Sequence, residues 1–383
     1  MTKIFIATGG TGGHIIPARC LAQELAKNGV AAFVLADAKY CNYIKPEDQF
    51  SSVIISSSQL VKTTLSLIKA TVKIFYGFAQ SCYYFLLHRP KYVVAFGGYA
   101  TFPILLAAIV TGTKIILHEQ NAHLGKVNRL FASQAFKIAL TFENTSGIST
   151  ENAAKLVVVG NPVRDEIAKL HEEKYQMPAK HVPVVRDKMG YDVILSSELD
   201  DYENAYDELF NILVIGGSGG AKIFSDILPK AFFNLGEELK NSLHISQQCR
   251  KDLVEYTFGQ YKSFNIDIAV AAFFDDMPEE IKAAHLVIAR AGSSSIVEFC
   301  AAKKPMILIP FAKAADNHQA KNAAIIENAG AAIVIAEENF TINKMSEVIK
   351  NLIGNKNLLE KMSENAGKIA NLNATKNLVK LLS

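Results

Sequence analysis

Two glycine-rich segments separate strand-like runs from helix-like runs, and either could hold a phosphate-containing ligand. Residues 9–13 (Gly-Gly-Thr-Gly-Gly) follow the apolar run 4–8, and residues 216–220 (Gly-Gly-Ser-Gly-Gly) repeat the arrangement 207 positions later. Glycine lets backbone N–H groups approach a ligand closely, and the start of the following helix adds a partial positive charge. A tight turn without a ligand would use the same residues, so the glycines alone leave both interpretations open.

His14 ends the first glycine-rich segment and is our candidate for a general base. Ligands of α/β folds bind where the strands end, and a histidine there can accept a proton near neutral pH. The alternative is a histidine that only caps the helix or bonds a local carbonyl. His118, Glu119, Gln120 and Asn121 follow another apolar run. We expect them to line a cleft, an ordinary polar loop being the alternative, and Glu119 is the second candidate for the base.

The C-terminal half carries a second group of candidate ligand-binding residues. Three serines at 293–295 follow the apolar run 286–289 and would open a helix, so that their hydroxyl and N–H groups could face an anion. Glu298, about one turn further on, could bind a ribose diol or simply be exposed. The polar cluster 316–319 (Asp-Asn-His-Gln) has side chains that suit sugar hydroxyls. No His, Asp or Glu cluster has metal-ligand spacing, so we expect no metal and no other cofactor.

The elements that must position these residues are short apolar strands alternating with amphipathic helices. We predict strands at residues 4–8, 32–36, 92–96, 114–117, 156–159, 212–215, 286–289 and 306–309. Continuous apolar strands are typical of a parallel sheet covered on both faces, and the β-α-β rhythm indicates a doubly wound α/β architecture.

One uncharged stretch has the length of a membrane span. Residues 92–113 contain no charged side chain over 22 positions, and a transmembrane helix needs about 20 apolar residues. Gly97, Gly98, Pro103 and Gly112 interrupt the stretch, so we predict a buried strand, a glycine turn and a helix instead. We expect no signal peptide at the N-terminus.

The length of the chain, its charge distribution and its cysteines limit the possible domain organisation and cellular compartment. At roughly 100–200 residues per domain, 383 residues suggest two domains. We expect an N-terminal domain at 1–165, a charge-rich linker or insertion at 166–210, a second domain at 211–345, and C-terminal helices at 346–383 that cross back to the first domain. Residues 1–165 contain 16 Lys/Arg and 8 Asp/Glu, whereas residues 166–383 contain 24 Lys/Arg and 29 Asp/Glu. The N-terminal half is therefore basic and could meet an anionic surface. Five scattered cysteines without a CxxC pair predict neither disulfides nor zinc, and favour a reducing compartment.

The motifs become specific when their order is considered. The chain contains Gly-Gly-Thr-Gly-Gly-His at 9–14, Gly-Gly-Tyr at 97–99, His-Glu-Gln-Asn at 118–121, Gly-Asn-Pro-Val-Arg at 160–164, Asp-Asp-Met at 275–277, Arg-Ala-Gly at 290–292 with Glu298, and His-Gln at 318–319. In this it resembles, over nearly its whole length, the MurG family of bacterial peptidoglycan N-acetylglucosaminyltransferases, in glycosyltransferase family 28. The resemblance implies the GT-B fold, with two Rossmann-like parallel-sheet domains.

The same resemblance implies a reaction and its partners. Enzymes of that family transfer N-acetylglucosamine from UDP-GlcNAc to the 4-hydroxyl of N-acetylmuramic acid in lipid I, with inversion, giving lipid II and UDP. The implied partners are UDP-GlcNAc, lipid I and an anionic membrane surface at the cytoplasmic face of the cell membrane, with no nucleic acid; contact with other cell-wall synthesis proteins is left open. The nucleotide is expected mainly in the C-terminal half. The implied donor contacts are Thr11, Gly12, Gly13, Asn121, Arg164, Ser218, Phe274 (through its backbone), Ser293, Ser294, Ser295, Glu298 and Gln319.

Departures from the family pattern put single contacts in question. Gly219 stands where the family usually has glutamine, residues 246–250 (Ser-Gln-Gln-Cys-Arg) replace His-Gln-x-Gly-Lys, and Ser293 and Ser294 replace alanine and an apolar residue. Three other functions remain open: a UDP-sugar epimerase of the same fold, a nucleotide-binding module without turnover, and a nucleotide-dependent oxidoreductase. For the last, Asp37 stands near the end of the second strand, but the third glycine of the dinucleotide motif is missing.

The segment 60–91 is basic and rich in apolar residues. No acidic residue occurs between positions 48 and 119, and Lys62, Lys69 and Lys73 recur at near-helical spacing. A helix with lysines beside an apolar face can rest on an anionic lipid surface, so we predict that this segment docks on a membrane. The alternative is that its apolar face packs in the core and the lysines are merely solvated.

Overall fold

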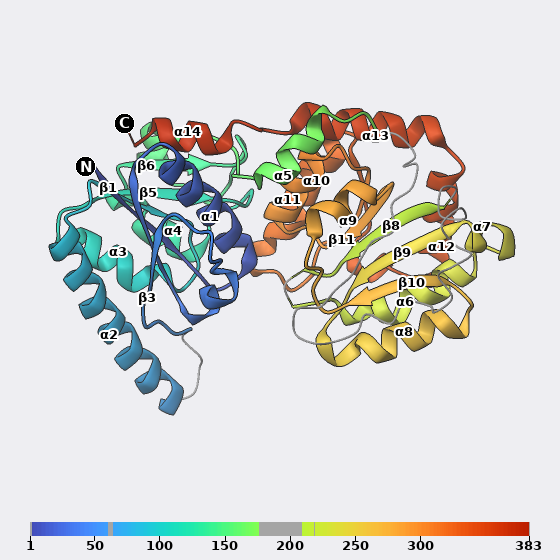
Figure 1. Ribbon diagram of the computed structural model, residues 1–383, viewed down its shortest axis with the longest axis horizontal. Coiled ribbons are helices and arrows are strands. Elements are labelled where there is room, and N and C mark those ends of the chain that lie inside the picture. Colours follow the sequence, from blue (N-terminus) through green and yellow to red (C-terminus); the bar gives the residue numbers. More distant parts are fainter. Residues whose placement is uncertain (1, 60–63, 176–208, 218, 383) are drawn as a thin grey trace. The chain divides into compact units, whose positions relative to one another are not determined.

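The computed structural model describes residues 2–59, 64–175, 209–217 and 219–382, and it divides the chain into two compact units (Figure 1). The first unit comprises Met1–Asp165 and Asn371–Ser383, and the second comprises Glu166–Ala370. The segment 176–208, part of the expected insertion, lies outside the described residues. The expected boundary at 345/346 falls inside helix α12 (Ile342–Ile353).

The first unit is built on a seven-stranded parallel sheet with the order β3-β2-β1-β4-β5-β6-β7. Its strands are β1 (Lys3–Thr8), β2 (Ala31–Ala36), β3 (Ser51–Ile54), β4 (Tyr92–Ala95), β5 (Lys114–Glu119), β6 (Lys137–Leu140) and β7 (Leu156–Val158). Its helices are α1 (Gly12–Lys27), α2 (Thr64–His88), α3 (Thr101–Val110), α4 (Lys126–Phe131) and α14 (Ala374–Lys380), and α5 (Asp165–Lys169) begins at its last residue before the second unit.

Helices cover both faces of this sheet because successive side chains of a strand point to opposite sides. In β1, Ile4 and Ile6 pack in one cluster with residues of α1 and α14, whereas Phe5 and Ala7 pack in another with residues of α2, α3 and α4. A strand buried on both faces must be apolar throughout, which is why its sequence shows no alternation.

The second unit repeats the plan with six parallel strands in the order β10-β9-β8-β11-β12-β13. Its strands are β8 (Phe210–Ile215), β9 (Leu243–Gln248), β10 (Asp267–Ala271), β11 (Leu286–Ala289), β12 (Met306–Leu308) and β13 (Ala332–Val334). Its helices are α6 (Lys222–Phe233), α7 (Glu237–Asn241), α8 (Val254–Ser263), α9 (Met277–Ala283), α10 (Ser293–Ala301), α11 (His318–Asn328), α12 and α13 (Lys356–Ile369).

The doubly wound parallel architecture is confirmed, and all eight predicted strands are present with ends shifted by no more than two residues. The uncharged stretch forms β4, a glycine turn and α3, as predicted. Among the described residues, no helix combines the length and the apolar character that crossing a membrane requires. In each sheet the strand order reverses beside the first strand, between β1 and β4 and between β8 and β11, and open α/β sheets bind ligands at such switch points.

Candidate functional site

At the switch point of the first unit, the turn after β1 packs against the turn after β4. Gly98 has φ +83°, and a Cβ there would lie 2.9 Å from the carbonyl oxygen of Gly9 and 3.5 Å from Nδ1 of His14. Only glycine allows both this backbone conformation and this approach. The Gly-Gly-Tyr motif therefore places one glycine turn directly beside the other and beside the candidate base.

Asp37 braces the same two turns. Its carboxylate accepts hydrogen bonds from the N–H of Gly10 (3.3 and 3.2 Å) and from the hydroxyl of Tyr99 (2.5 Å). Lys39 donates to the carbonyl oxygen of Gly10 at 3.1 Å. The acidic residue that made a dinucleotide site worth considering is thus buried and engaged within the protein itself.

His14 lies in the first turn of α1, whose N-terminus no side chain caps. Its Nδ1 is 3.0 Å from Oγ1 of Thr11, and the hydroxyl of Thr8 donates to its backbone carbonyl at 2.8 Å. The side chain is half-buried, and Thr11 is exposed. The predicted residues Thr11, Gly12, Gly13 and His14 are therefore contiguous at the start of one helix, where an anionic ligand is favoured.

Three of the four residues in the polar run 118–121 are almost fully buried, and Asn121 is half-exposed. His118 and Glu119 are the last residues of β5. The ring Nε2 of His118 lies 2.9 Å from the carbonyl oxygen of Gly160, and its Nδ1 lies 2.9 Å from the side-chain amide nitrogen of Gln120. Burial lowers the pKa of His118 to about 4, and the charge of His14 acts in the same direction. His118 is therefore neutral, with the proton on Nε2.

Glu119, the second candidate for the base, is occupied on both oxygens. Its Oε1 accepts from the N–H and the side-chain amide of Asn121 (3.0 and 3.1 Å), and its Oε2 accepts from the N–H of Gly125 (2.8 Å) and the side-chain amide of Asn128 (2.9 Å). Burial raises the pKa of Glu119, against the effect of these hydrogen bonds. Such contacts suit a carboxylate that shapes the turn and orients the half-exposed Asn121 better than one that receives a proton.

Arg164 acts electrostatically on Tyr43, which lies against the first glycine turn. The hydroxyl of Tyr43 lies against Gly12, where a Cβ would come within 2.8 Å of it. Burial raises the pKa of Tyr43, and the opposing effect of Arg164 shows that the guanidinium charge acts on this hydroxyl. Arg164 thus adds positive charge near the N-terminus of α1.

In the second unit, residues 290–292 separate β11 from α10, which begins at Ser293, and no side chain caps its N-terminus. Ser293 is buried, Ser294 and Ser295 are half-buried, and Glu298 is buried rather than exposed. The glycine turn after β8 is tight because a Cβ on Gly220 would lie 2.7 Å from the backbone nitrogen of Arg250. Ser218, in this turn, lies outside the described residues.

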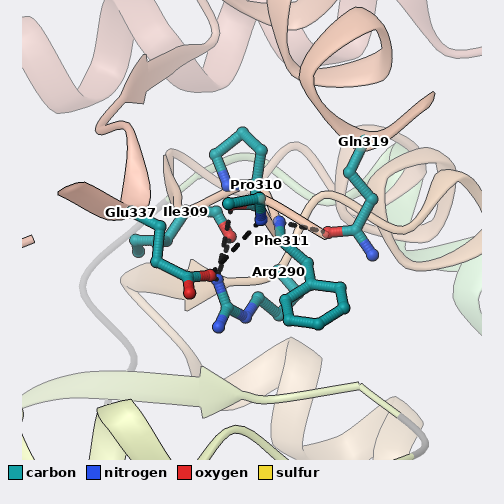
Figure 2. A network of polar contacts seen from close by, with 7 residues as sticks. Arg290, Ile309, Pro310, Phe311, Gln319 and Glu337 are labelled. Carbon is teal, nitrogen blue, oxygen red and sulfur yellow. Dashed lines mark hydrogen bonds and ion pairs between the residues drawn. The ribbon is translucent and has the colours of Figure 1, made fainter. Parts of the chain in front are cut away.

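Two further predicted residues flank these turns. The side chain of Phe274 is buried, so only its backbone could face a base, whereas the neighbouring Phe273 is 60% exposed. Gln319 lies in the first turn of α11, and its Oε1 accepts from the N–H of Phe311 at 2.8 Å (Figure 2). Within the described ranges, no group of three or more His, Cys, Asp or Glu side chains is arranged to hold a metal ion.

The sequence did not identify Arg290 and Glu337 as residues that hold the loop after β12, which contains Phe311. Arg290 stands in the sequence only as part of the Arg-Ala-Gly motif, and Glu337 belongs to none of the motifs. They are 47 residues apart in sequence, yet Nη1 of Arg290 lies 2.5 Å from Oε2 of Glu337. A basic residue directly after a strand at the switch point is a signal that could have identified Arg290.

Comparisons with known proteins cover the whole chain. Residues 4–140 match the glycosyltransferase family 28 N-terminal domain, and residues 211–382 match the family's C-terminal domain. A Caulobacter vibrioides protein named UDP-N-acetylglucosamine--N-acetylmuramyl-(pentapeptide) pyrophosphoryl-undecaprenol N-acetylglucosamine transferase is 33% identical, with 100% of this chain and 99% of the relative covered. A Rickettsia rickettsii protein of the same name is 34% identical over 95% of each chain.

Solved structures agree with this assignment. The crystal structure of Acinetobacter baumannii MurG has a TM-score of 0.71 and 26% identity, covering 100% of this chain and 99% of that one. A UDP-GlcNAc 2-epimerase from Neisseria meningitidis has a TM-score of 0.66 at 16% identity, covering 100% and 99% of the two chains, which shows a shared fold alone. The chain therefore belongs to glycosyltransferase family 28 and has the GT-B fold.

Proposed function

We propose that this protein transfers N-acetylglucosamine from UDP-GlcNAc to the 4-hydroxyl of N-acetylmuramic acid in lipid I, forming lipid II and UDP with inversion. The observation that carries this proposal is the full-length similarity, at 33%, to a relative named for that transfer. The geometry supports it, because residues 11–14 follow β1 and residues 293–295 follow β11, each at a strand that borders the switch point of its sheet.

The proposed chemistry assigns a role to each group. The acceptor hydroxyl oxygen attacks C1 of the sugar and forms the glycosidic bond, while the bond from C1 to the diphosphate oxygen breaks and UDP leaves with its electrons. His14 receives the hydroxyl proton. The N–H groups at the start of α10 and the charge of Arg164 stabilise the negative charge that develops on the leaving group. Glu298 binds the ribose, and Gln319 binds the sugar.

Incubation with UDP-GlcNAc and a soluble lipid I analogue tests the proposal. Mass spectrometry should detect the disaccharide product and an equal amount of UDP. Conversion of UDP-GlcNAc without any acceptor would instead identify an epimerase, and UDP binding without turnover would identify a binding module. Either result would contradict the transfer reaction.

Helix α2 has apolar residues on its outer side as well as toward the core. The core-facing positions are mostly small: Ala70, Gly77, Ser81 and Phe85 are buried, and a Cβ on Gly77 would lie only 1.8 Å from the carbonyl oxygen of Ser56. Phe78, Tyr84 and Phe85 pack toward the core, but many other large apolar side chains of α2 lie outward. We call the exposed residues Leu67, Ile68, Val72, Phe75, Tyr76, Tyr83, Leu86 and Leu87 the outer face of α2.

We also propose that this outer face rests on an anionic membrane surface at the cytoplasmic side of the cell membrane, making the protein a peripheral one. Val110, at the end of the neighbouring helix α3 (Figure 1), is 70% exposed, as is Phe75. Lys69 and Lys73 are exposed on α2, whereas Lys62 lies outside the described residues. An apolar surface flanked by lysines suits the boundary between lipid head groups and acyl chains. The proposed acceptor is a membrane lipid, so the protein must contact the membrane to reach it.

A further inference from the structure

Arg290 binds two backbone carbonyl groups of the loop 309–312, which follows β12. Its Nη1 donates to the carbonyl oxygens of Ile309 (3.1 Å) and Pro310 (3.4 Å), as Figure 2 shows. The guanidinium lies over two aromatic rings, 5.1 Å from the centre of Phe224 and 5.3 Å from that of Phe311. The side chain is 9% exposed, so this is a buried cation that organises a loop at the carboxyl edge of the sheet.

Two other side chains hold the amide side of the same loop. The N–H of Phe311 donates to Oε1 of Gln319 at 2.8 Å, and the N–H of Ala312 donates to Oε2 of Glu337 at 3.4 Å. That Glu337 oxygen also accepts from Arg290 at 2.5 Å. Of the five backbone polar groups from the carbonyl of Ile309 to the N–H of Ala312, four are thus bound by side chains, and the carbonyl of Phe311 accepts from the N–H of Ala314.

This arrangement determines which part of Gln319 a ligand can meet. Because a backbone N–H can only donate, the atom of Gln319 that faces Phe311 must be the oxygen. The amide nitrogen is therefore directed away from Phe311 (Figure 2). If the loop shifted, the amide would lose the contact that sets its orientation. Glu337 prevents such a shift by pairing with the buried guanidinium, which would otherwise carry an uncompensated charge.

We propose that Arg290 and Glu337 are positioning residues for the donor sugar, acting through Phe311 on the amide of Gln319. This inference rests on the proposed function, in which Gln319 binds the sugar of UDP-GlcNAc. It predicts that breaking the pair impairs recognition of the sugar and spares recognition of UDP, because neither residue is assigned to the nucleotide.

The first test needs no ligand. In the full-length Glu337→Ala protein, amide hydrogen exchange at Phe311 and Ala312 should be faster than in the wild type, by about tenfold. Glu338→Ala is the matched control, since Glu338 is an exposed neighbour in the same short 3-10 helix, Glu337–Asn339. Unchanged exchange at both amides would show that Glu337 does not hold the loop 309–312, whatever reaction the protein catalyses.

The second test compares dissociation constants of UDP-GlcNAc and UDP by calorimetry. Glu337→Ala should weaken UDP-GlcNAc by about two- to tenfold, the value of one neutral hydrogen bond, and change UDP affinity less than about twofold. Gln319→Ala should do the same, and the double variant should be no worse than Gln319→Ala alone, because the two residues act through one contact. Equal weakening of both ligands, or additive losses, would overturn the positioning role.

Glu337→Gln separates positioning from a general effect on folding. This variant keeps an acceptor for Ala312 and Arg290 but removes the charge, so it should show an intermediate loss of UDP-GlcNAc affinity and lose less thermal stability than Glu337→Ala. Wild-type affinity for UDP-GlcNAc in both Glu337 variants would contradict the proposal. If the wild type failed to transfer sugar but the exchange result held, the proposed function would be contradicted. The conclusion that Arg290 and Glu337 hold the loop 309–312 would remain.

Discussion

Nδ1 of His14 lies 3.0 Å from Oγ1 of Thr11. A threonine hydroxyl can accept from Nδ1–H, and the tautomer that donates in this way has an unprotonated Nε2, the form that can receive a proton. The contact therefore suits a base that acts through Nε2. It also explains why a threonine, rather than glycine, stands at the centre of the first glycine-rich segment.

His14→Ala should lower kcat by about 10²–10⁴, the usual cost of losing a general base, and leave UDP affinity near that of the wild type. Turnover at saturating substrates and calorimetric UDP binding would measure the two effects. His123→Ala, at a half-exposed histidine of the same unit, is the matched control and should retain activity. Near-normal turnover of His14→Ala would remove it as the base.

Glu119→Gln should act mainly on stability. A neutral amide offers one acceptor oxygen in place of two, so donors from the set Asn121, Gly125 and Asn128 would face an NH₂ group, at about 1–3 kcal/mol for each stranded group. Thermal denaturation should show a clear drop in Tm, and kcat, measured where the variant is folded, should fall less than in His14→Ala. Wild-type Tm with a hundredfold loss of kcat would show instead that Glu119 takes part in the chemistry.

The strands that were predicted from the sequence are mainly those that are apolar along most of their length. Residues of β4 and β11 are apolar without interruption, which marks strands covered on both faces. Five strands were not predicted: β3, β6, β9, β10 and β13. Three of them, β3, β10 and β13, are sheet edges, where one missing neighbour weakens the apolar pattern. The other two lie inside their sheets, but β9 (Leu-His-Ile-Ser-Gln-Gln) is interrupted by polar residues and β6 (Lys-Ile-Ala-Leu) is short and begins with a lysine.

The candidate site was predictable as far as its motifs are local. The glycine turns and the uncapped start of α10 follow from consecutive residues. The burial of His118 and Glu119 does not, because it depends on Gly160 and Asn128, which are brought to β5 by the fold. For the same reason the sequence of residues 118–121 does not reveal that most of these polar side chains are buried and bind backbone groups.

Glu298→Ala and Gln319→Ala should separate nucleotide recognition from sugar recognition. Glu298 is buried near the start of α10, and its loss should weaken UDP itself, since a hydrogen bond to a charged group contributes about 1.5–3 kcal/mol. Gln319→Ala should raise KM for UDP-GlcNAc and reduce the preference for it over other UDP-sugars. Initial rates with UDP-GlcNAc and UDP-GalNAc, together with UDP calorimetry, give both quantities. UDP affinity unchanged by Glu298→Ala would exclude that residue from the site.

Acid should destabilise the protein before its carboxylates titrate. Burial lowers the pKa of His118 to about 4 and that of His285 to about 3, from a usual value of 6.5. Below about pH 6.5 the unfolded chain therefore binds protons that the folded chain does not, so the stability present above that pH is lost as pH falls toward 4. Each histidine contributes up to about 1.4 kcal/mol per pH unit to this slope. Urea denaturation between pH 7.5 and 5 measures the slope.

His118→Gln provides the comparison for that slope. The variant cannot bind the proton, so its unfolding free energy should fall with acid by about one proton less than that of the wild type. His123→Ala should keep the wild-type slope. An unchanged slope in His118→Gln, or direct observation that the His118 ring protonates near pH 6.5 by NMR, would show that the folded state tolerates its charge.

Lys69→Glu/Lys73→Glu should release the protein from anionic vesicles. Each lysine near an anionic leaflet contributes about 1 kcal/mol, and reversing its charge adds repulsion. Phe75→Ser should also weaken sedimentation with vesicles by removing the 70% exposed ring from the outer face of α2. High salt should reduce wild-type binding, because it screens the lysines. UDP affinity should stay unchanged, since α2 carries none of the residues assigned to the donor nucleotide.

The control must remove the same charge elsewhere. Lys350→Glu/Lys361→Glu changes two exposed lysines on α12 and α13 of the second unit, so its net charge equals that of the α2 variant. If binding depended only on net charge, both double variants would leave the vesicles together. If the outer face of α2 is the docking surface, only the α2 variant should dissociate, and Phe75→Ser, which alters no charge, should dissociate with it. Co-sedimentation of all three variants at the wild-type level would show that α2 does not face the membrane.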